Sequence, residues 1–328
     1  MNLPMTPTSS LDRRHFLRIG ALASLGFAAA AHAQPAPSPA PAPSRGVLRP
    51  SLNAYSFLEQ LNANLAASDK GIDLFGVLDF CARHEIPAAD LTGYFFPGYP
   101  AVPKEGYVSR IKKYAHERGI VISGTGVKND FASADRAVRQ AGVELTKTWV
   151  EVAASLGAPV IRVFAGPHGG KEWQAHAGGA RRADVEAWMA EDLRACAEHG
   201  RRYGVLVAIQ NHGDFLSAAP EHISLLRRVG HEWCGALVDT GKYFTPDPYA
   251  DIAMMVPYAF NWQVKETLGS SLKSPATDYR RLVRILLEGG YRGFLPIETL
   301  AMGRKDYDPA AEVLKVLHGL RGALAEAR

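Results

Sequence analysis

The sequence predicts a single (β/α)8 TIM barrel that begins at Leu48, and two observations lead to that fold class. After Leu48, short apolar runs rich in β-branched residues alternate with longer stretches of helical periodicity. Eight such pairs fit within about 280 residues, the usual number and length for this barrel. A doubly wound parallel sheet is the alternative, but the segment Asn53-Ala-Tyr-Ser-Phe57 after the first predicted strand is no glycine-rich phosphate loop.

The predicted strands and helices follow one another in alternation. Ser133-Ala134-Asp135-Arg136 begins one helix, Gly204 follows another, and Gly289-Gly290 closes a third. The predicted strands are 50–56, 87–93, 120–127, 159–166, 205–212, 235–240, 260–266 and 293–299. The predicted helices are 71–85, 106–118, 134–157, 183–203, 219–229, 248–257, 278–289 and 309–326.

Composition and charge exclude several other classes of protein. The chain has 47% hydrophobic and 21% charged residues, as ordinary soluble proteins do. Its net charge of +4 falls to +2 without residues 1–33, because 34 basic and 32 acidic residues remain. So small an imbalance gives no electrostatic reason to expect a nucleic acid or an anionic membrane surface as a partner. Its 3 cysteines cannot build a disulfide framework.

The first residues have the features of an export signal. Arg13-Arg14 precede a weakly apolar run over 19–31, and Ala31-His32-Ala33 has the small-x-small form of a signal-peptidase site. The paired arginines resemble a twin-arginine signal, which predicts export to the periplasm by that machinery. A general secretory signal or a basic arm is the alternative. The apolar run is too short to span a bilayer, so we expect no stable membrane insertion.

A proline-rich spacer follows the signal. Prolines recur over 35–43 among alanines and serines, a composition that favours an extended polyproline conformation. We therefore predict a twin-arginine signal peptide at 1–33, a Pro/Ala-rich linker at 34–47 and the barrel at 48–328.

Polar side chains stand at the carboxyl ends of four consecutive predicted strands, where barrels carry their chemistry. Gln210, Asp239, Gln263 and Glu298 occupy these ends, and strands about 4.8 Å apart allow such side chains to converge. They form a hard, oxygen-only set that favours Mn²⁺, with Mg²⁺ or Ca²⁺ as alternatives, over zinc. Each residue alone would suit a structural hydrogen bond, but the four together predict a divalent metal site.

The last four strands resemble those of xylose-isomerase-like sugar isomerases and epimerases, and the resemblance covers essentially all of 48–328. That family typically holds one divalent metal with Glu, Asp, His and Glu from strands five to eight. Asp239 and Glu298 match this pattern, and so does Lys265, two residues after the strand-seven ligand. Gln210, Gln263 and Lys242 depart from it, standing where Glu, His and His are usual. The segments that carry the resemblance are Ile209-Gln210-Asn211-His212, Val238-Asp239-Thr240-Gly241-Lys242, Trp262-Gln263-Val264-Lys265-Glu266 and Pro296-Ile297-Glu298-Thr299.

These departures change the mechanism that the resemblance implies. In the epimerases the strand-five and strand-eight glutamates act as paired acid and base on opposite faces of the sugar. The Gln210 amide cannot accept a proton near neutral pH, so that two-base epimerisation is disabled. One-base chemistry remains: Glu298 removes a proton next to a carbonyl while the metal stabilises the enediolate. Lys265 or Lys242 adds positive charge or returns the proton.

Such a site suits two reactions on a small-molecule sugar or glycoside. An aldose–ketose isomerisation moves the proton between neighbouring carbons, and a β-elimination from a 3-keto-glycoside expels the C1 substituent. An exported enzyme meets glycosides rather than sugar phosphates, which stay in the cytoplasm. A hydride-shift isomerisation usually involves two metals and more carboxylates than the chain offers here.

Other polar and aromatic residues predict a sugar pocket around the metal, because rings cover the C–H faces of a sugar and polar groups bond its hydroxyls. A structural role stays open for each: Asp90 would cap a loop, and Tyr94 and Phe131 would pack it. His168 and His176 of the loop 167–179 would suggest zinc, but we expect no Cys or carboxylate partner near them. The predicted substrate-binding residues are Asn53, Tyr55, Asp90, Tyr94, Phe131, Arg162, His168, His212 and Glu266.

Two other classes of function stay open. A non-catalytic periplasmic sugar-binding or accessory protein would be a barrel whose metal site has decayed to Gln210 and Gln263. A DNA-repair enzyme of the endonuclease-IV type shares the barrel, but it needs a multi-zinc cluster with several histidines at the strand ends. The last predicted helix covers the barrel rather than a partner, which leaves the oligomeric state open; its apolar residues are Leu314, Val316, Leu317, Leu320 and Leu324.

Overall fold

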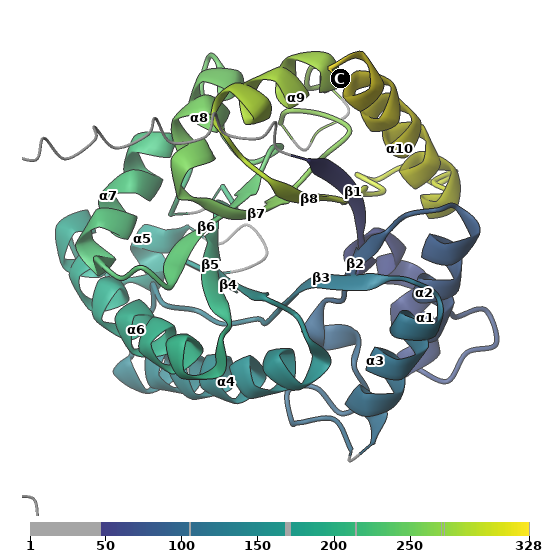
Figure 1. The fold of residues 1–328 in the computed structure, drawn as a ribbon. Coiled ribbons are helices and arrows are strands. Elements are labelled where there is room, and N and C mark those ends of the chain that lie inside the picture. The colour runs from purple at the N-terminus through teal and green to yellow at the C-terminus, as the bar shows by residue number, and fades with distance from the viewer. Residues whose placement is uncertain are drawn as a thin grey trace, which may run out of the picture. The chain divides into compact units, whose positions relative to one another are not determined.

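The computed structural model describes residues 47–104, 106–167, 172–213, 215–269, 271 and 273–327. In it eight parallel strands form the wall of a barrel that helices surround, which confirms the predicted fold class (Figure 1). The strands are β1 (Leu48–Asn53), β2 (Ala88–Asp90), β3 (Val121–Gly126), β4 (Val160–Phe164), β5 (Leu206–Gln210), β6 (Cys234–Asp239), β7 (Ala259–Gln263) and β8 (Gly293–Ile297). The predicted signal and nearly all of the predicted linker lie outside the described residues.

The helices that surround the strands include all eight that the sequence predicts. They are α1 (Leu58–Leu65), α2 (Leu74–Arg83), α3 (Tyr107–Glu117), α4 (Arg136–Leu156), α5 (Trp173–His176), α6 (Arg182–Tyr203), α7 (Ala219–Val229), α8 (Pro248–Met255), α9 (Tyr279–Glu288) and α10 (Pro309–Glu326). The sequence did not predict α1, because it has only 8 residues and buries only Leu61, so its apolar period covers little more than two turns. The four-residue α5 is too short to show a period.

Strand order and a short seam close the barrel. The strands pair in the order β7-β6-β5-β4-β3-β2-β1-β8. Between the two ends of this order, the Val264 amide donates to the Pro296 carbonyl at 2.8 Å, and the Glu298 amide donates to the Val264 carbonyl at 3.0 Å. The segments that follow β7 and β8 therefore lie side by side, which brings Lys265 next to Glu298.

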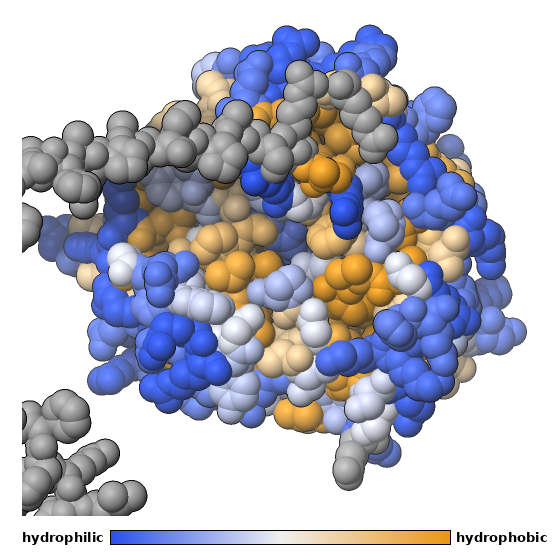
Figure 2. All heavy atoms as spheres, viewed as in Figure 1, coloured by the Kyte–Doolittle hydropathy of each residue, from blue (hydrophilic) through white to orange (hydrophobic). Residues whose placement is uncertain are grey.

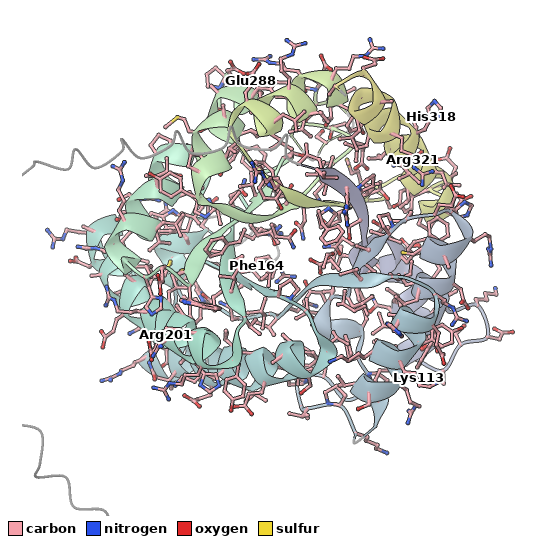
Figure 3. All side chains as sticks on the ribbon, in the orientation of Figure 1. Lys113, Phe164, Arg201, Glu288, His318 and Arg321 are labelled. Atoms are coloured by element: carbon pink, nitrogen blue, oxygen red, sulfur yellow. The ribbon has the colours of Figure 1, made fainter. Side chains whose placement is uncertain are left out.

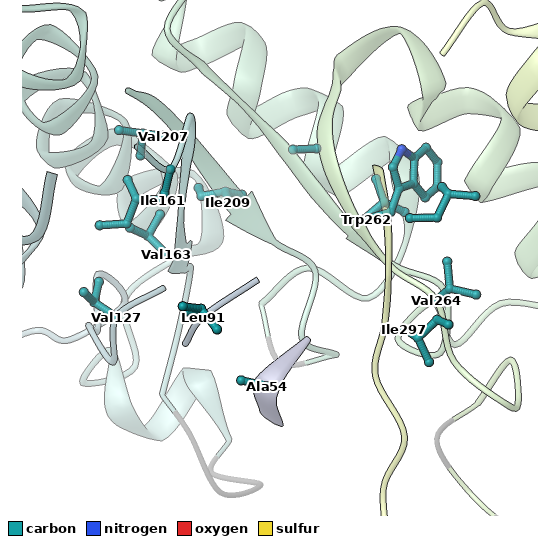
Figure 4. Packing of buried hydrophobic residues seen from close by; sticks show 14 of the residues in the cluster. Ala54, Leu91, Val127, Ile161, Val163, Val207, Ile209, Trp262, Val264 and Ile297 are labelled. Atoms are coloured by element: carbon teal, nitrogen blue, oxygen red, sulfur yellow. The ribbon is translucent and has the colours of Figure 1, made fainter. Parts of the chain in front are cut away.

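Alternation along the strands divides their side chains between two apolar clusters, as the sequence predicts. Val160, Ala208 and Leu237 form a small cluster of their own. They share a side of their strands with Arg162, Gln210 and Asp239, so the cluster lies inside the barrel, toward the amino ends of the strands. The opposite side packs into the large core beneath the helices (Figure 4), and includes Ile161, Val163, Val207, Ile209, Trp262 and Ile297.

The helix ends show the predicted signals. The Asp135 carboxylate caps α4 by accepting from the Ala137 amide at 2.8 Å. Gly204, with φ of 70°, ends α6 in the left-handed conformation that glycine adopts without strain. Val316, Leu317 and Leu320 of α10 are buried against the barrel, which confirms the predicted covering role of this helix. None of the described helices combines the length and apolar character of a membrane span.

Candidate active site

A cavity of about 430 Å³ lies at the carboxyl ends of the strands. In the view of Figure 2, hydrophilic residues gather around the rim of the molecule and hydrophobic residues nearer its middle. Figure 3 places Phe164, at the end of β4, near the centre of the barrel, with Lys113 and Arg201 at its periphery. The cavity is lined by Tyr55, Leu58, Tyr94, Lys128, Arg162, Phe164, Gln210, His212, Asp239, Lys242, Gln263, Lys265, Glu298, Leu300, Ala301 and Met302.

The structure brings the four predicted ligand residues to this cavity. The Gln210 amide nitrogen donates to Asp239 Oδ2 at 3.0 Å and to Gln263 Oε1 at 2.6 Å. Glu298 follows β8, next to the segment after β7, and all four side chains are buried. The sequence therefore located the residues correctly, while their ligand roles remain predictions.

Lys265 is a buried cation between the two acids. Its ammonium contacts Glu298 Oε1 and lies 3.7 Å from Asp239 Oδ2, and the residue is 1% exposed. Burial opposes the charge of the ammonium, but Asp239 and Glu298 outweigh that effect and hold the pKa of Lys265 above its ordinary value. A fixed positive charge therefore occupies the centre of the site.

The donors as arranged do not fit a divalent metal. A cation would need carboxylate and amide oxygens turned toward it. Here the Gln210 amide nitrogen donates to Asp239, and the Lys265 ammonium donates to Glu298 and lies close to Asp239. One feature favours a cation, since Gln210 Oε1 is buried without a partner among the described residues.

Neighbouring residues hold the ends of β5, β6 and β7 in place. The Asn211 side chain donates to the Asp239 carbonyl at 3.0 Å and accepts from the Asp239 amide at 2.8 Å. Asp239 Oδ1 accepts from the Gly241 amide at 2.9 Å. The Thr240 hydroxyl accepts from the Lys265 amide at 3.0 Å. These bonds fix the backbones that carry Asp239 and Lys265.

Arg162 and Lys128 form a second group of positive charge around the ring of Tyr94. The Arg162 guanidinium donates to the Val127 carbonyl at 2.6 Å and to the Tyr94 hydroxyl. Its Cζ atom lies 5.4 Å from the centre of the Tyr94 ring, and Lys128 Nζ lies 4.4 Å from the same centre. Burial and the nearby Arg162 charge lower the pKa of Lys128.

Three predicted substrate-binding residues are not among the described residues that line the cavity. Asn53 accepts from the Tyr55 amide at 2.9 Å and so fixes the turn that presents Tyr55. Asp90 accepts from Asn261 at 3.1 Å across the barrel, and burial raises the pKa of Asp90 to about 7. Glu266 accepts from the Leu300 amide at 3.1 Å and holds the loop after β8.

The structure places Phe131 and His176 of the predicted pocket away from the roles that a sugar or zinc site would give them. The Phe131 side chain is fully buried, which is the packing role that the sequence left open. His176 contacts the carboxylate of Asp130, so the expectation that it has no acid partner was wrong. His168 lies outside the described residues.

Sequence reasoning missed several residues of the wall. Phe164 shares its side of β4 with Arg162, so alternation alone could have indicated it, and its ring lies 4.9 Å from that of His212. Lys128 lies in the loop after β3, where no strand alternation indicates which side chains face the cavity. The apolar residues that no motif indicated are Leu58, Leu300, Ala301 and Met302.

Known proteins match this arrangement in fold. The family described as xylose isomerase-like TIM barrel matches residues 78–320. D-psicose 3-epimerase from Clostridium cellulolyticum H10 superposes with a TM-score of 0.67 at 14% identity, over 84% of this chain and 99% of the other. An L-ribulose 3-epimerase gives 0.65 at 17% identity, over 86% and 97%. D-allulose 3-epimerase from Methylomonas sp. gives 0.67 at 13%, over 85% and 98%. No curated protein matches in sequence.

Proposed function

This chain belongs to the xylose isomerase-like TIM barrel family, and we propose that it is a carbohydrate isomerase-like enzyme that removes a proton next to a carbonyl with a single base. The observation that carries the proposal is the contact between Glu298 and Lys265 in the wall of the cavity. A carboxylate beside a fixed ammonium supplies the two groups that enolisation needs.

The proposed step assigns one role to each partner. The Glu298 carboxylate takes the proton from the carbon next to the carbonyl, and the C–H electron pair forms the new carbon–carbon double bond. The carbonyl oxygen receives the displaced electron pair and becomes an enolate, which the Lys265 ammonium stabilises. An ammonium has three N–H donors, so the contact with Glu298 leaves others for the substrate oxygen. Lys242, also at the cavity, supplies further positive charge.

Two reactions complete this step, on a keto-sugar or a 3-keto-glycoside. Return of the proton to the neighbouring carbon gives an isomerisation, and expulsion of the C1 substituent gives a β-elimination. The structural neighbours include proteins named as 3-epimerases. Gln210 offers no second base at the end of β5, which is why we propose one-base chemistry for this chain.

Deuterium exchange tests the proposal directly. Mature protein in D₂O, followed by NMR with 3-keto-glucosides and ketoses, should introduce deuterium at the carbon next to the carbonyl. Glu298→Gln should slow that exchange by about 100-fold or more, since a positioned base contributes about that much. Glu288→Gln, an exposed glutamate at the end of α9, is the matched control and should change nothing. Exchange that survives in Glu298→Gln would contradict the assigned base.

The same assay tests the predicted Mn²⁺. Enolisation that uses Lys265 should proceed equally after treatment with EDTA and after addition of Mn²⁺. An activity restored by Mn²⁺ alone would instead support the metal site at Gln210, Asp239, Gln263 and Glu298.

A non-catalytic sugar-binding protein is the second candidate. The hydrogen bonds that Gln210 gives to Asp239 and Gln263 favour it, because they hold these three side chains in a network that needs no reaction. This candidate predicts sugar binding without deuterium exchange, and no change in Glu298→Gln.

We also propose that the protein acts in the periplasm. The support is the sequence at 9–33, with its paired arginines, apolar run and cleavage site. That compartment agrees with glycosides as substrates.

A further inference from the structure

We propose that the substrate carries an anionic group, a carboxylate or a phosphate, and that Arg162 and Lys128 bind it on the wall opposite Glu298 and Lys265. This inference rests on the proposed function, because it concerns the same cavity. It adds the chemical class of the substrate, an acidic sugar. A sugar acid agrees with the proposed periplasmic location, and a sugar phosphate would contradict that location.

Arg162 is a buried charge whose hydrogen bonds within the described residues go to uncharged groups. It is 4% exposed, and its guanidinium donates to a backbone carbonyl and to a tyrosine hydroxyl. Its Nε atom is buried and has no hydrogen-bond partner within the described residues. A guanidinium removed from water is costly without a counter-charge, so an incoming anion would stabilise it.

Asp90, whose pKa Arg162 lowers, does not supply that counter-charge in full. Asp90 accepts a hydrogen bond from Asn261, and no ion pair joins it to Arg162 within the described part of the chain. Arg162 lowers the pKa of Asp90, but burial outweighs this effect and raises it to about 7. Asp90 therefore carries only part of a negative charge near neutral pH.

Lys128 makes the site a pair of cations. Both charges lie over the Tyr94 ring, and Arg162 also lies 3.9 Å from the centre of the Phe164 ring. The aromatic rings hold the guanidinium plane in place, and its fork matches the two oxygens of a carboxylate or phosphate. Lys128 is exposed, so it can approach a ligand oxygen from the solvent side.

Charge and position within the cavity point to the same substrate. The lining includes Lys128, Arg162, Lys242 and Lys265 but only Asp239 and Glu298 as acids, so positive charge is in excess by two. In the ring of strands, β4 is four places from β8 and β3 is four places from β7. An anion at Arg162 therefore points the rest of the substrate toward Glu298.

A comparison of the binding of an acidic and a neutral sugar tests the inference without turnover. Mature Glu298→Gln protein, titrated calorimetrically at low salt, should bind glucuronate about tenfold or more tightly than glucose, because charge-assisted bonds add at least that much. Lys128→Met should remove most of this preference, with a much larger loss of affinity for glucuronate than for glucose. Lys113→Met, an exposed lysine of α3, is the matched control and should leave the preference intact. Arg162→Lys, which keeps the charge but loses the fork, should weaken glucuronate binding several-fold.

The remaining arms identify the anion and separate the two proposals. Tighter binding of glucose 6-phosphate than of glucuronate would select a phosphate, and the reverse a carboxylate. Equal affinities for glucose, glucuronate and glucose 6-phosphate would overturn the inference. So would a Lys128→Met variant that weakens glucose binding as much as it weakens glucuronate binding. Deuterium exchange on neutral keto-sugars with no anion preference would leave the proposed function standing. An anion preference with no exchange on any substrate would support the anion site and contradict the proposed function.

Discussion

At the scale of single residues, Lys265 places a positive charge between the two acids of the cavity wall. The sequence placed it at a position that the resembling family shares, and so gave no sign that its ammonium would lie between Asp239 and Glu298. Its burial and its contact with Glu298 depend on the segments after β7 and β8 lying side by side, which the sequence alone does not show. A lysine can supply fixed charge where a metal otherwise would, but it cannot coordinate a substrate through several open positions.

His222 of α7 leads to a prediction about pH and stability. It is fully buried, its Nδ1 atom lies 3.3 Å from the Tyr243 hydroxyl, and burial lowers the pKa of His222 to about 3. Between pH of roughly 6.5 and 3 the unfolded chain binds a proton here that the folded protein does not. Stability should therefore fall as the pH falls through that window, by up to about 1.4 kcal/mol per unit.

Denaturant unfolding at several pH values measures this dependence. His222→Phe cannot bind the proton and should flatten the slope between pH 6 and 4, even if it is less stable throughout. His318→Gln, an exposed histidine of α10, should retain the wild-type slope. An unchanged slope in His222→Phe would show that other groups cause the acid sensitivity.

At the scale of elements, β3 controls where Arg162 lies. Gly126 ends β3 beside Arg162 of β4, and a Cβ atom there would lie 2.9 Å from Arg162 Cζ. Gly126→Ala should therefore displace the guanidinium and reduce the preference for glucuronate over glucose, at a stability cost of about 1–3 kcal/mol for the forced contact.

Gly322 of α10 provides the matched control. A Cβ atom added there meets nothing within 4 Å, so Gly322→Ala should keep the preference and stabilise the helix by up to about 1 kcal/mol. Calorimetric titration and thermal unfolding of both variants check the pair. If Gly126→Ala binds glucuronate as the wild type does, β3 does not position Arg162.

The sequence predicted elements and strand faces better than it predicted contacts. Period-two alternation placed Arg162 and Gln210 in the lumen, because that rule depends on the strand alone. The partners of Gln210 and Lys265 depend on which strands meet, and the loop residues of the wall follow no period. Asn53 and Glu266 lie near the site but support loops, a distinction that needs the positions of Tyr55 and Leu300.

At the scale of the whole molecule, the barrel pairs its first strand with its last. β1 pairs with β8, from Leu48 opposite Gly293 to Leu52 opposite Ile297. The wall is therefore incomplete until nearly all of the chain has been made, and contacts so distant in sequence form slowly. Glu298 and Lys265 also meet only at the closing seam. A protein of this topology suits a route that exports folded chains, as the twin-arginine route does.

That argument makes a prediction about Arg13 and Arg14. Changing both to lysine keeps the positive charge that a general secretory signal needs, but removes the arginine pair. In a Gram-negative host the double variant should lose the mature periplasmic form and accumulate as cytoplasmic precursor, detected by fractionation and immunoblotting. Arg18→Lys, outside the pair, is the matched control and should be exported normally. Normal export of the double variant would mean that the chain crosses unfolded and that its barrel, with the Lys265–Glu298 contact, closes only in the periplasm.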